Sequence, residues 1–209
     1  MARVKLGNVR TPIEYLKQYF ASAGYGLGEY AKQVDSTEDI DTIKSFGAYS
    51  WNANKPANAP SDYMCMIPVF RNSTNGTQYF QRDTLQGAYE VCGRRVMADG
   101  VWGEFEWINP PMEVGKEYRT IERRQGKAVY TKLVDCGAMP NTESKIVAHN
   151  CAAIMMLRCC GTTNLGTTIP YRWNDSYTAV SADRTNIHLC TNADFSGQTC
   201  MVQLWYTKD

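Results

Sequence analysis

Two histidine and cysteine pairs have a spacing that is compatible with metal binding. His149 and Cys151 are two positions apart, and so are His188 and Cys190. Residues two apart on a β-strand share a face, and zinc prefers imidazole and thiolate ligands. The pairs would supply four ligands if their segments met. The alternative is that the cysteines are small buried hydrophobic side chains, because the chain's eight cysteines include no CxxC pair. We therefore predict no metal centre and no cofactor, with these four residues as the alternative.

Two glutamates could serve as a catalytic carboxylate pair. Glu104 and Glu106 would lie on one face of a strand, roughly 7 Å apart by the rise of two residues, and glycosidases use two carboxylates across a groove. A simpler interpretation is that Glu104 pairs with Arg95 on the solvent face of a hairpin. No G-x-S-x-G motif accompanies either histidine. We predict that the protein is not an enzyme, and hydrolysis of surface glycans ranks third among its possible functions.

One stretch, PYRWNDSY at residues 170–177, combines aromatic rings with amide, carboxylate and guanidinium groups. Aromatic faces stack on sugar rings, polar groups satisfy sugar hydroxyls, and such side chains usually sit on loops over a rigid scaffold. The alternative is that its aromatic residues alternate because they pack on one face of a strand. The candidate receptor-binding residues are Tyr171, Arg172, Trp173, Asn174, Asp175 and Tyr177. A second polar loop, residues 71–76, reads more simply as a hairpin turn.

Short helices are expected near the amino terminus and strands beyond it. Thr11-Pro12-Ile13-Glu14 is a capping box with proline at the first helical position, and AGYGLG at residues 23–28 would follow as a flexible joint. The stretch STEDIDTIKSFG predicts a second helix, capped by Asp35 or Ser36, with Ile40 and Ile43 facing inward. After it, residues typical of strands alternate with turn signals, which indicates antiparallel β structure.

The Asp99-Gly100 turn predicts the register of a hairpin, because DG is a strong type I′ signal. It would place Met97 opposite Trp102 and Arg95 opposite Glu104. The predicted core face comprises Cys92, Val96, Val101, Phe105 and Trp107. The predicted outer face comprises Arg95, Met97, Trp102, Glu104 and Glu106.

A second hairpin is expected in KEYRTIERRQGKAVYTKLV. A three-residue loop ending at Gly126 would pair Ile121 with Val129, and we favour it over a two-residue loop that would pair Arg119 with Lys132. In residues 201–206, Met201, Gln203 and Trp205 alternate with Val202, Leu204 and Tyr206. This alternation predicts a terminal strand that closes a sheet or sandwich.

Composition and charge exclude several classes of protein. The 209 residues carry 22 Lys and Arg against 21 Asp and Glu, so the chain has no large positive charge that would favour binding to nucleic acid. No apolar run approaches the ~20 residues of a membrane span, and we expect no membrane insertion. The amino terminus lacks the apolar region of a signal peptide, which predicts synthesis in the cytoplasm and cysteines that remain free thiols.

These motifs resemble bacteriophage tail fibres over nearly the whole chain. The knob-type domain of the tail fibres of phages and pyocins resembles the stretches DIDTIKSFGAYSW, NAPSDY, YFQRDT and VWGEFEW. The distal ends of tail fibre and receptor-binding proteins of gut phages are similar to PPMEVGKEYRTIERRQGKAVYTKLVDCGAMPN and TNADFSGQTCMVQLWYTKD. Members of this family often follow a long shaft, whereas about thirty-five residues precede the knob-like stretch here.

The resemblance implies a mainly β, virion-located protein with short amino-terminal helices. Residues 1–35 would attach to other tail proteins, 36–109 would form a knob-like α+β domain, 110–140 a hairpin connector, and 141–209 a distal antiparallel β-sandwich-like domain with the receptor-binding tip. Such modules form homotrimers and bind a receptor on the host surface, often a glycan. The alternative function is a connector or decoration protein that binds another virion protein.

Overall fold

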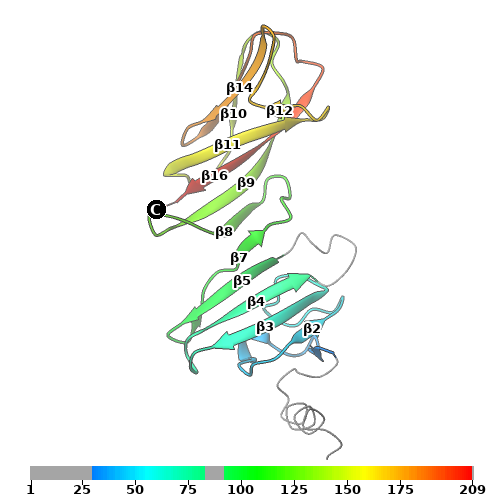
Figure 1. Ribbon diagram of the computed structural model, residues 1–209, viewed down its shortest axis with the longest axis vertical. Helices are drawn as coiled ribbons and strands as arrows, with labels where there is room; N and C mark the ends of the chain where they lie inside the picture. The colour runs from blue at the N-terminus through cyan, green and yellow to red at the C-terminus, as the bar shows by residue number, and fades with distance from the viewer. Residues whose placement is uncertain (1–29, 83–91, 209) are drawn as a thin grey trace, which may run out of the picture. The chain divides into compact units, whose positions relative to one another are not determined.

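The chain divides into two compact units, Met1–Phe105 and Glu106–Asp209. The structure is a computed structural model that describes residues 30–82 and 92–208. Strands dominate both units (Figure 1), which confirms the mainly β class. The helix and joint expected within residues 11–28 lie outside the described residues. In the described ranges, no helix has the length and apolar character needed to span a membrane.

The first unit is a twisted sheet in the order β1-β2-β3-β4-β5, with β6 added to β5. The β1 and β2 strands are parallel and the other neighbours are antiparallel. Alternate residues of β3 are buried, as expected for a sheet with one face on the core. The elements are β1 (Lys32–Gln33), η1 (Ile40–Thr42), β2 (Tyr49–Trp51), β3 (Met64–Phe70), β4 (Gly76–Arg82), β5 (Cys92–Ala98) and β6 (Val101–Trp102).

The helix predicted in residues 36–47 is reduced to the 3-10 turn η1. Its N-cap is Asp39, not Asp35 or Ser36, and the Asp39 side chain accepts from the backbone N–H of Asp41. Backbone hydrogen bonds join Ile40 N–H to the carbonyl of Ala57, and Ala57 N–H to the carbonyl of residue 38. This long-range pairing draws the segment away from helical geometry, so tertiary contacts override its local helix signals. The prediction that Ile40 faces inward is confirmed, since it is fully buried.

The two faces of the β5–β6 hairpin are the reverse of those predicted. The turn pairs Met97 with Trp102 and Ala98 with Val101, as expected. However, Met97 is only 2% exposed, whereas Val101 is 72% exposed. Residues 103–105 also lie outside any strand, so the strand that returns from the turn ends before Glu104. The alignment of Arg95 with Glu104 therefore does not continue from the turn as a ladder.

A buried polar cluster explains why the charged face is the inner one. Arg95, 9% exposed, forms an ion pair with Asp41 of η1 and donates from Nη2 to Oε1 of Gln78 at 2.7 Å. Gln78, itself fully buried, donates from Nε2 to the Ile40 carbonyl at 2.7 Å. The Arg95 guanidinium also lies 4.5 Å from the centre of the Trp102 ring. These contacts neutralise the buried charge, although Nε of Arg95 makes no hydrogen bond, so the arginine can take a core position.

The outer face of the same sheet carries several exposed apolar side chains, together with Arg94, which lies opposite Tyr79. The strand register places these side chains close together on that face. Ile67 lies opposite Tyr79, and Val69 and Val96 both lie opposite residue 77. Patches of exposed apolar residues on a soluble domain commonly mark interaction sites. We call this set the outer apolar face, which comprises Ile67, Val69, Tyr79, Val96 and Val101.

The second unit is a sandwich of two sheets. One has the order β7-β8-β9-β16-β11-β12 and the other β10-β15-β14-β13. Their shared core includes Leu204 and Tyr206 from β16 and Ile187 and Leu189 from β15, all fully buried. The strands are β7 (Glu106–Asn109), β8 (Glu117–Arg124), β9 (Lys127–Ala138), β10 (Ser144–Ala148), β11 (Met155–Thr163), β12 (Thr168–Ile169), β13 (Tyr171–Trp173), β14 (Ser176–Ala182), β15 (Asn186–Thr191) and β16 (Thr199–Thr207).

The carboxyl-terminal strand β16 alternates as predicted, but it occupies the middle of its sheet. It pairs antiparallel with β9 on one side and with β11 on the other (Figure 1). Val202, Leu204 and Tyr206 are fully buried, whereas Met201 on the other face is exposed. A strand paired on both sides positions its neighbours, so β16 organises the sheet and does not close its edge.

The β8–β9 hairpin has a two-residue turn, so the favoured three-residue loop is wrong. Gln125 and Gly126 both have positive φ, of 53° and 80°, as a type I′ turn requires. The turn pairs Arg124 with Lys127. A register shift then lies between Arg119 and residue 123, so neither of the two predicted alignments extends along the whole hairpin. This bulge shifts the pairing of β8 with β9, and so changes which side chains of β8 lie opposite those of β9.

Candidate functional site

The predicted receptor-binding residues form the short β13–β14 hairpin. Tyr171 pairs with Thr178, Arg172 with Tyr177, and Trp173 with Ser176, while Asn174 and Asp175 form the turn. Thr178 is buried, and Tyr171 opposite it is half-buried. Arg172 and Tyr177 lie opposite each other and are both exposed, Tyr177 by 39%.

This register corrects the alternative that the three aromatic residues share one face of a strand. Tyr171 lies opposite Thr178, whereas Tyr177 lies opposite Arg172 and belongs to the other face. The tight turn causes the difference, because the chain reverses direction between residues 173 and 176. The hairpin therefore presents one arginine and one tyrosine together on its exposed side.

Asn192, which follows β15, braces the hairpin. Its Oδ1 accepts from the backbone N–H of Tyr177 at 2.6 Å, and its Nδ2 donates to the carbonyl of Asp175 at 2.5 Å. Asn174 has a φ of 51°, the left-handed conformation that asparagine tolerates better than most residues. The exposed Arg172 and Tyr177 thus stand on a backbone that is held at both ends of the turn.

The histidine and cysteine pairs do not form the alternative metal site. His149 is buried, its Nε2 lies 3.2 Å from the carbonyl of Asp183, and its Nδ1 accepts from the backbone N–H of Cys151 at 3.1 Å. His188 lies on β15, with Nε2 2.8 Å from Oδ2 of Asp183. This contact, with backbone N–H groups of residues 185 and 186, holds the pKa of Asp183 well below its usual range. Within residues 30–82 and 92–208, no three His, Cys, Asp or Glu side chains are grouped to hold a metal ion.

Several of the cysteines that were predicted to remain free thiols are free in the structure. They are Cys136, Cys151, Cys159, Cys160, Cys190 and Cys200.

Glu104 and Glu106 do not share a strand face, contrary to the arrangement considered for a hydrolase. Glu104 lies between β6 and β7, whereas Glu106 begins β7. Glu106 is only 4% exposed and forms ion pairs with Arg119 and Arg123. A buried carboxylate that is neutralised by two arginines, both of which contact its Oε1, is a structural group.

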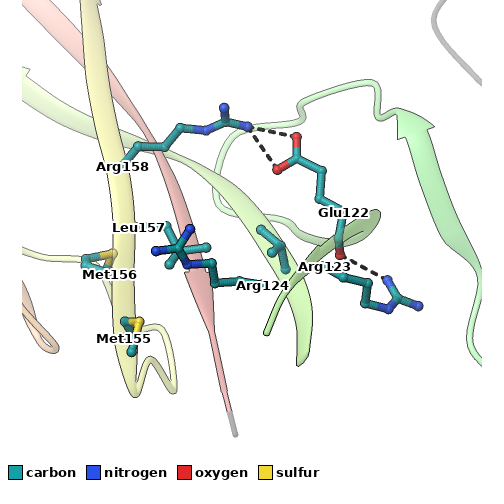
Figure 2. Close-up of a pocket in the computed structure, with 8 residues that line it drawn as sticks. Glu122, Arg123, Arg124, Met155, Met156, Leu157 and Arg158 are labelled. Carbon is teal, nitrogen blue, oxygen red and sulfur yellow. Dashed lines mark hydrogen bonds and ion pairs between the residues drawn. The ribbon is translucent and has the colours of Figure 1, made fainter. Parts of the chain in front are cut away.

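A cavity at the end of β8 was not predicted from the sequence. It has a volume of about 400 Å³, and Figure 2 shows its lining. It lies where the bulged end of β8 faces β11, which has its own register shift between Met156 and Arg158. Its lining residues are Glu122, Arg123, Arg124, Val129, Met155, Met156, Leu157 and Arg158.

Arginines dominate the polar lining of this cavity. Arg158 donates from Nη2 to both carboxylate oxygens of Glu122, at 2.8 and 3.2 Å, and its guanidinium lies 4.3 Å from the centre of the Trp205 ring. Arg123 and Arg124 leave β8 in opposite directions, as successive strand residues do (Figure 2). The run Glu122-Arg123-Arg124 was the available sequence signal, but Arg158 is 36 positions from Glu122 and only the sheet brings them together.

The solved structures that resemble this chain are pyocin tail fibres. The N-truncated R2-type pyocin tail fibre has 12% identity and a TM-score of 0.33, covering 85% of this chain and 98% of that chain. The carboxyl-terminal part of the P. aeruginosa R1 pyocin fibre has 12% identity and a TM-score of 0.34, covering 88% and 68%. No protein-family model and no curated protein sequence matches this chain. Identities and TM-scores this low carry no functional detail from those fibres to this protein.

Proposed function

We propose that the protein is a structural component of a phage tail, a tail fibre or receptor-binding protein that attaches the particle to a glycan on the host surface. The observation that carries the proposal is the β13–β14 hairpin, where Arg172 and Tyr177 lie exposed and opposite each other. Their guanidinium and phenol groups suit sugar hydroxyls and sugar faces, and Asn192 holds the backbone beneath them. The sequence resemblance to tail fibre tips supports the same role. We propose binding without catalysis.

Binding of labelled protein to candidate host cells tests this function. We expect Tyr177→Ala and Arg172→Met each to weaken cell binding roughly tenfold, because aromatic and arginine side chains are frequent binding hot spots. Tyr30→Ala is the matched control, since Tyr30 is 81% exposed but belongs to the first unit. Thermal unfolding of each variant should be unchanged.

Undiminished cell binding by both hairpin variants would contradict the proposed site. Failure to bind intact cells, together with binding to a purified tail or capsid component, would instead establish the connector or decoration function. Release of sugar from host glycan would indicate a hydrolase. The proposed attachment of residues 1–35 to other tail proteins is tested by deleting them and measuring incorporation into particles.

We also propose that the protein is a homotrimer, as its resemblance to tail fibres implies, and that the outer apolar face contributes to the contact between copies. Light scattering at micromolar concentration should give three times the chain mass of 23.6 kDa. Val69→Lys and Val96→Lys should lower this mass, because each places a charge among exposed apolar residues on adjacent strands. Arg71→Glu, a charge change at an exposed position next to β3, is the control. A monomer of the unaltered protein would refute the proposal.

A further inference from the structure

The cavity at the end of β8 has an excess of positive charge. Arg119 and Arg123 share the single carboxylate of Glu106. Arg124 makes no ion pair with any residue of the described ranges, and it lies opposite Lys127 in the hairpin register. The lining itself carries three arginines, Arg123, Arg124 and Arg158, against the one carboxylate of Glu122, although the whole chain has a net charge of only +1. The excess is therefore local to this end of the sheet.

Hydrogen-bond donors remain available in the cavity. The pair with Glu122 uses only Nη2 of Arg158, so Nε and Nη1 have no partner among the described residues. The guanidinium is held in place on its other side by the Trp205 ring. A guanidinium whose orientation is preset presents its donors to a carboxylate or phosphate at little entropic cost.

Neutral polar groups continue from the cavity along the same strand pair. Arg158 pairs with Trp205, and on the same face the next pair is Cys160 with Gln203. A second depression, of about 270 Å³, is lined by Cys160 and Gln203 together with Thr162. It begins roughly 7 Å further on, by the rise of two residues. The arginine-lined cavity therefore adjoins Thr162 and the amide of Gln203, whose Nε2 already donates to Oγ1 of Thr131 and whose Oε1 remains an acceptor for a sugar hydroxyl.

From this arrangement we propose that the cavity between β8 and β11 binds the acidic group of an anionic saccharide, a carboxylate or a phosphate, with Arg124 and Arg158 as its ligands. Glu122 forms an ion pair with Arg158 and competes with the ligand for it. The site is separate from the β13–β14 hairpin, which contributes none of its lining residues. Binding at this cavity is measured with soluble probes and not with cells. A negative result here can therefore be distinguished from a failure of the protein to attach to host cells.

Calorimetric titration of the full chain with three probes tests the proposal. The probes are trigalacturonate, which carries carboxylates, a glycerol phosphate trimer, and neutral maltotriose. We expect at least one acidic probe to bind tenfold or more tightly than maltotriose in about 0.05 M salt, and to weaken in about 0.5 M salt. The preferred acidic probe identifies the acidic group.

Variants separate this site from a diffuse charge effect. Arg124→Met and Arg158→Met should each weaken the acidic probe roughly tenfold. Arg184→Met removes an equal charge from the exposed turn between β14 and β15, and should have no effect. Glu122→Gln should strengthen binding severalfold, because it removes the competing carboxylate and keeps the side-chain shape. Arg158 and Glu122 are about half exposed, so their variants should remain folded.

Four outcomes would overturn the proposal. They are equal affinity for maltotriose and both acidic probes, no measurable binding of either acidic probe, an equal loss in Arg184→Met, and weaker binding in Glu122→Gln. The last outcome would mean that the Glu122 and Arg158 pair is itself part of the binding surface, or that the pair only supports the fold.

Discussion

Replacing Arg95 with methionine should lower the free energy of unfolding of the first unit by about 3–5 kcal/mol, the usual loss when one partner of a buried ion pair is removed. The variant strips Asp41 of its ion pair and leaves Oε1 of the fully buried Gln78 without the donor it has at 2.7 Å. It also removes the guanidinium that packs on Trp102. Methionine fills a similar volume, so the loss reports polar contacts more than a cavity.

Urea unfolding monitored by fluorescence measures this effect. Arg71→Met, an exposed arginine in the same unit, is the matched control and should change stability by less than about 0.5 kcal/mol. A double variant that also carries Asp41→Asn should lose less than the sum of the two single losses, because both changes break the same interaction. A loss at Arg95 no larger than that at Arg71 would show that the buried polar cluster does not stabilise the sheet.

Met97→Ala should destabilise the first unit by about 2–5 kcal/mol, whereas Val101→Ala should change its stability by less than about 0.5 kcal/mol. Met97 is 2% exposed and Val101 is 72% exposed, although only the turn at residues 99–100 and Ala98 separate them along the chain. The loss at Met97 combines the transfer of buried methylene groups with the cavity left behind.

The same urea titration, performed on both variants, decides which face of the hairpin is buried. Val96→Ala is a further comparison, since Val96 neighbours Met97 on β5 but is 39% exposed. A larger loss at Val101 than at Met97 would restore the sequence-based assignment, in which the valines form the core. If the outer apolar face contacts another copy, the losses at Val96 and Val101 should grow with protein concentration, whereas that at Met97 should not.

Much of the local structure could be predicted from the sequence. The turn at residues 99–100 correctly pairs Met97 with Trp102, because its residue types adopt positive φ readily. The alternation in residues 201–206 correctly places Val202, Leu204 and Tyr206 on one buried face. The strand content follows from the same signals, since both features depend on residues that are close in the chain.

Non-local features were predicted poorly. The inner face of the first sheet was missed because Arg95 finds its partners at Asp41 and Gln78, 54 and 17 positions away. The register of β8 and β9 was missed because a bulge follows a two-residue turn. The cavity at the end of β8 was missed because its lining comes from β8 and β11, which are not neighbours in the sheet.

The sequence by itself determined most of the strand segments, the turn at residues 99–100 and the alternation of side chains in residues 201–206, because side chains alternate along any extended backbone. Tertiary structure alone decided which of the two faces is buried, which strand occupies the middle of a sheet, and where arginines gather into a site. Those choices depend on whether a partner from a distant segment satisfies a buried charge or fills a core position. The role of the β13–β14 hairpin in receptor binding stays a prediction: the sequence supplied its residues, and the fold presents Arg172 and Tyr177 together on its exposed side.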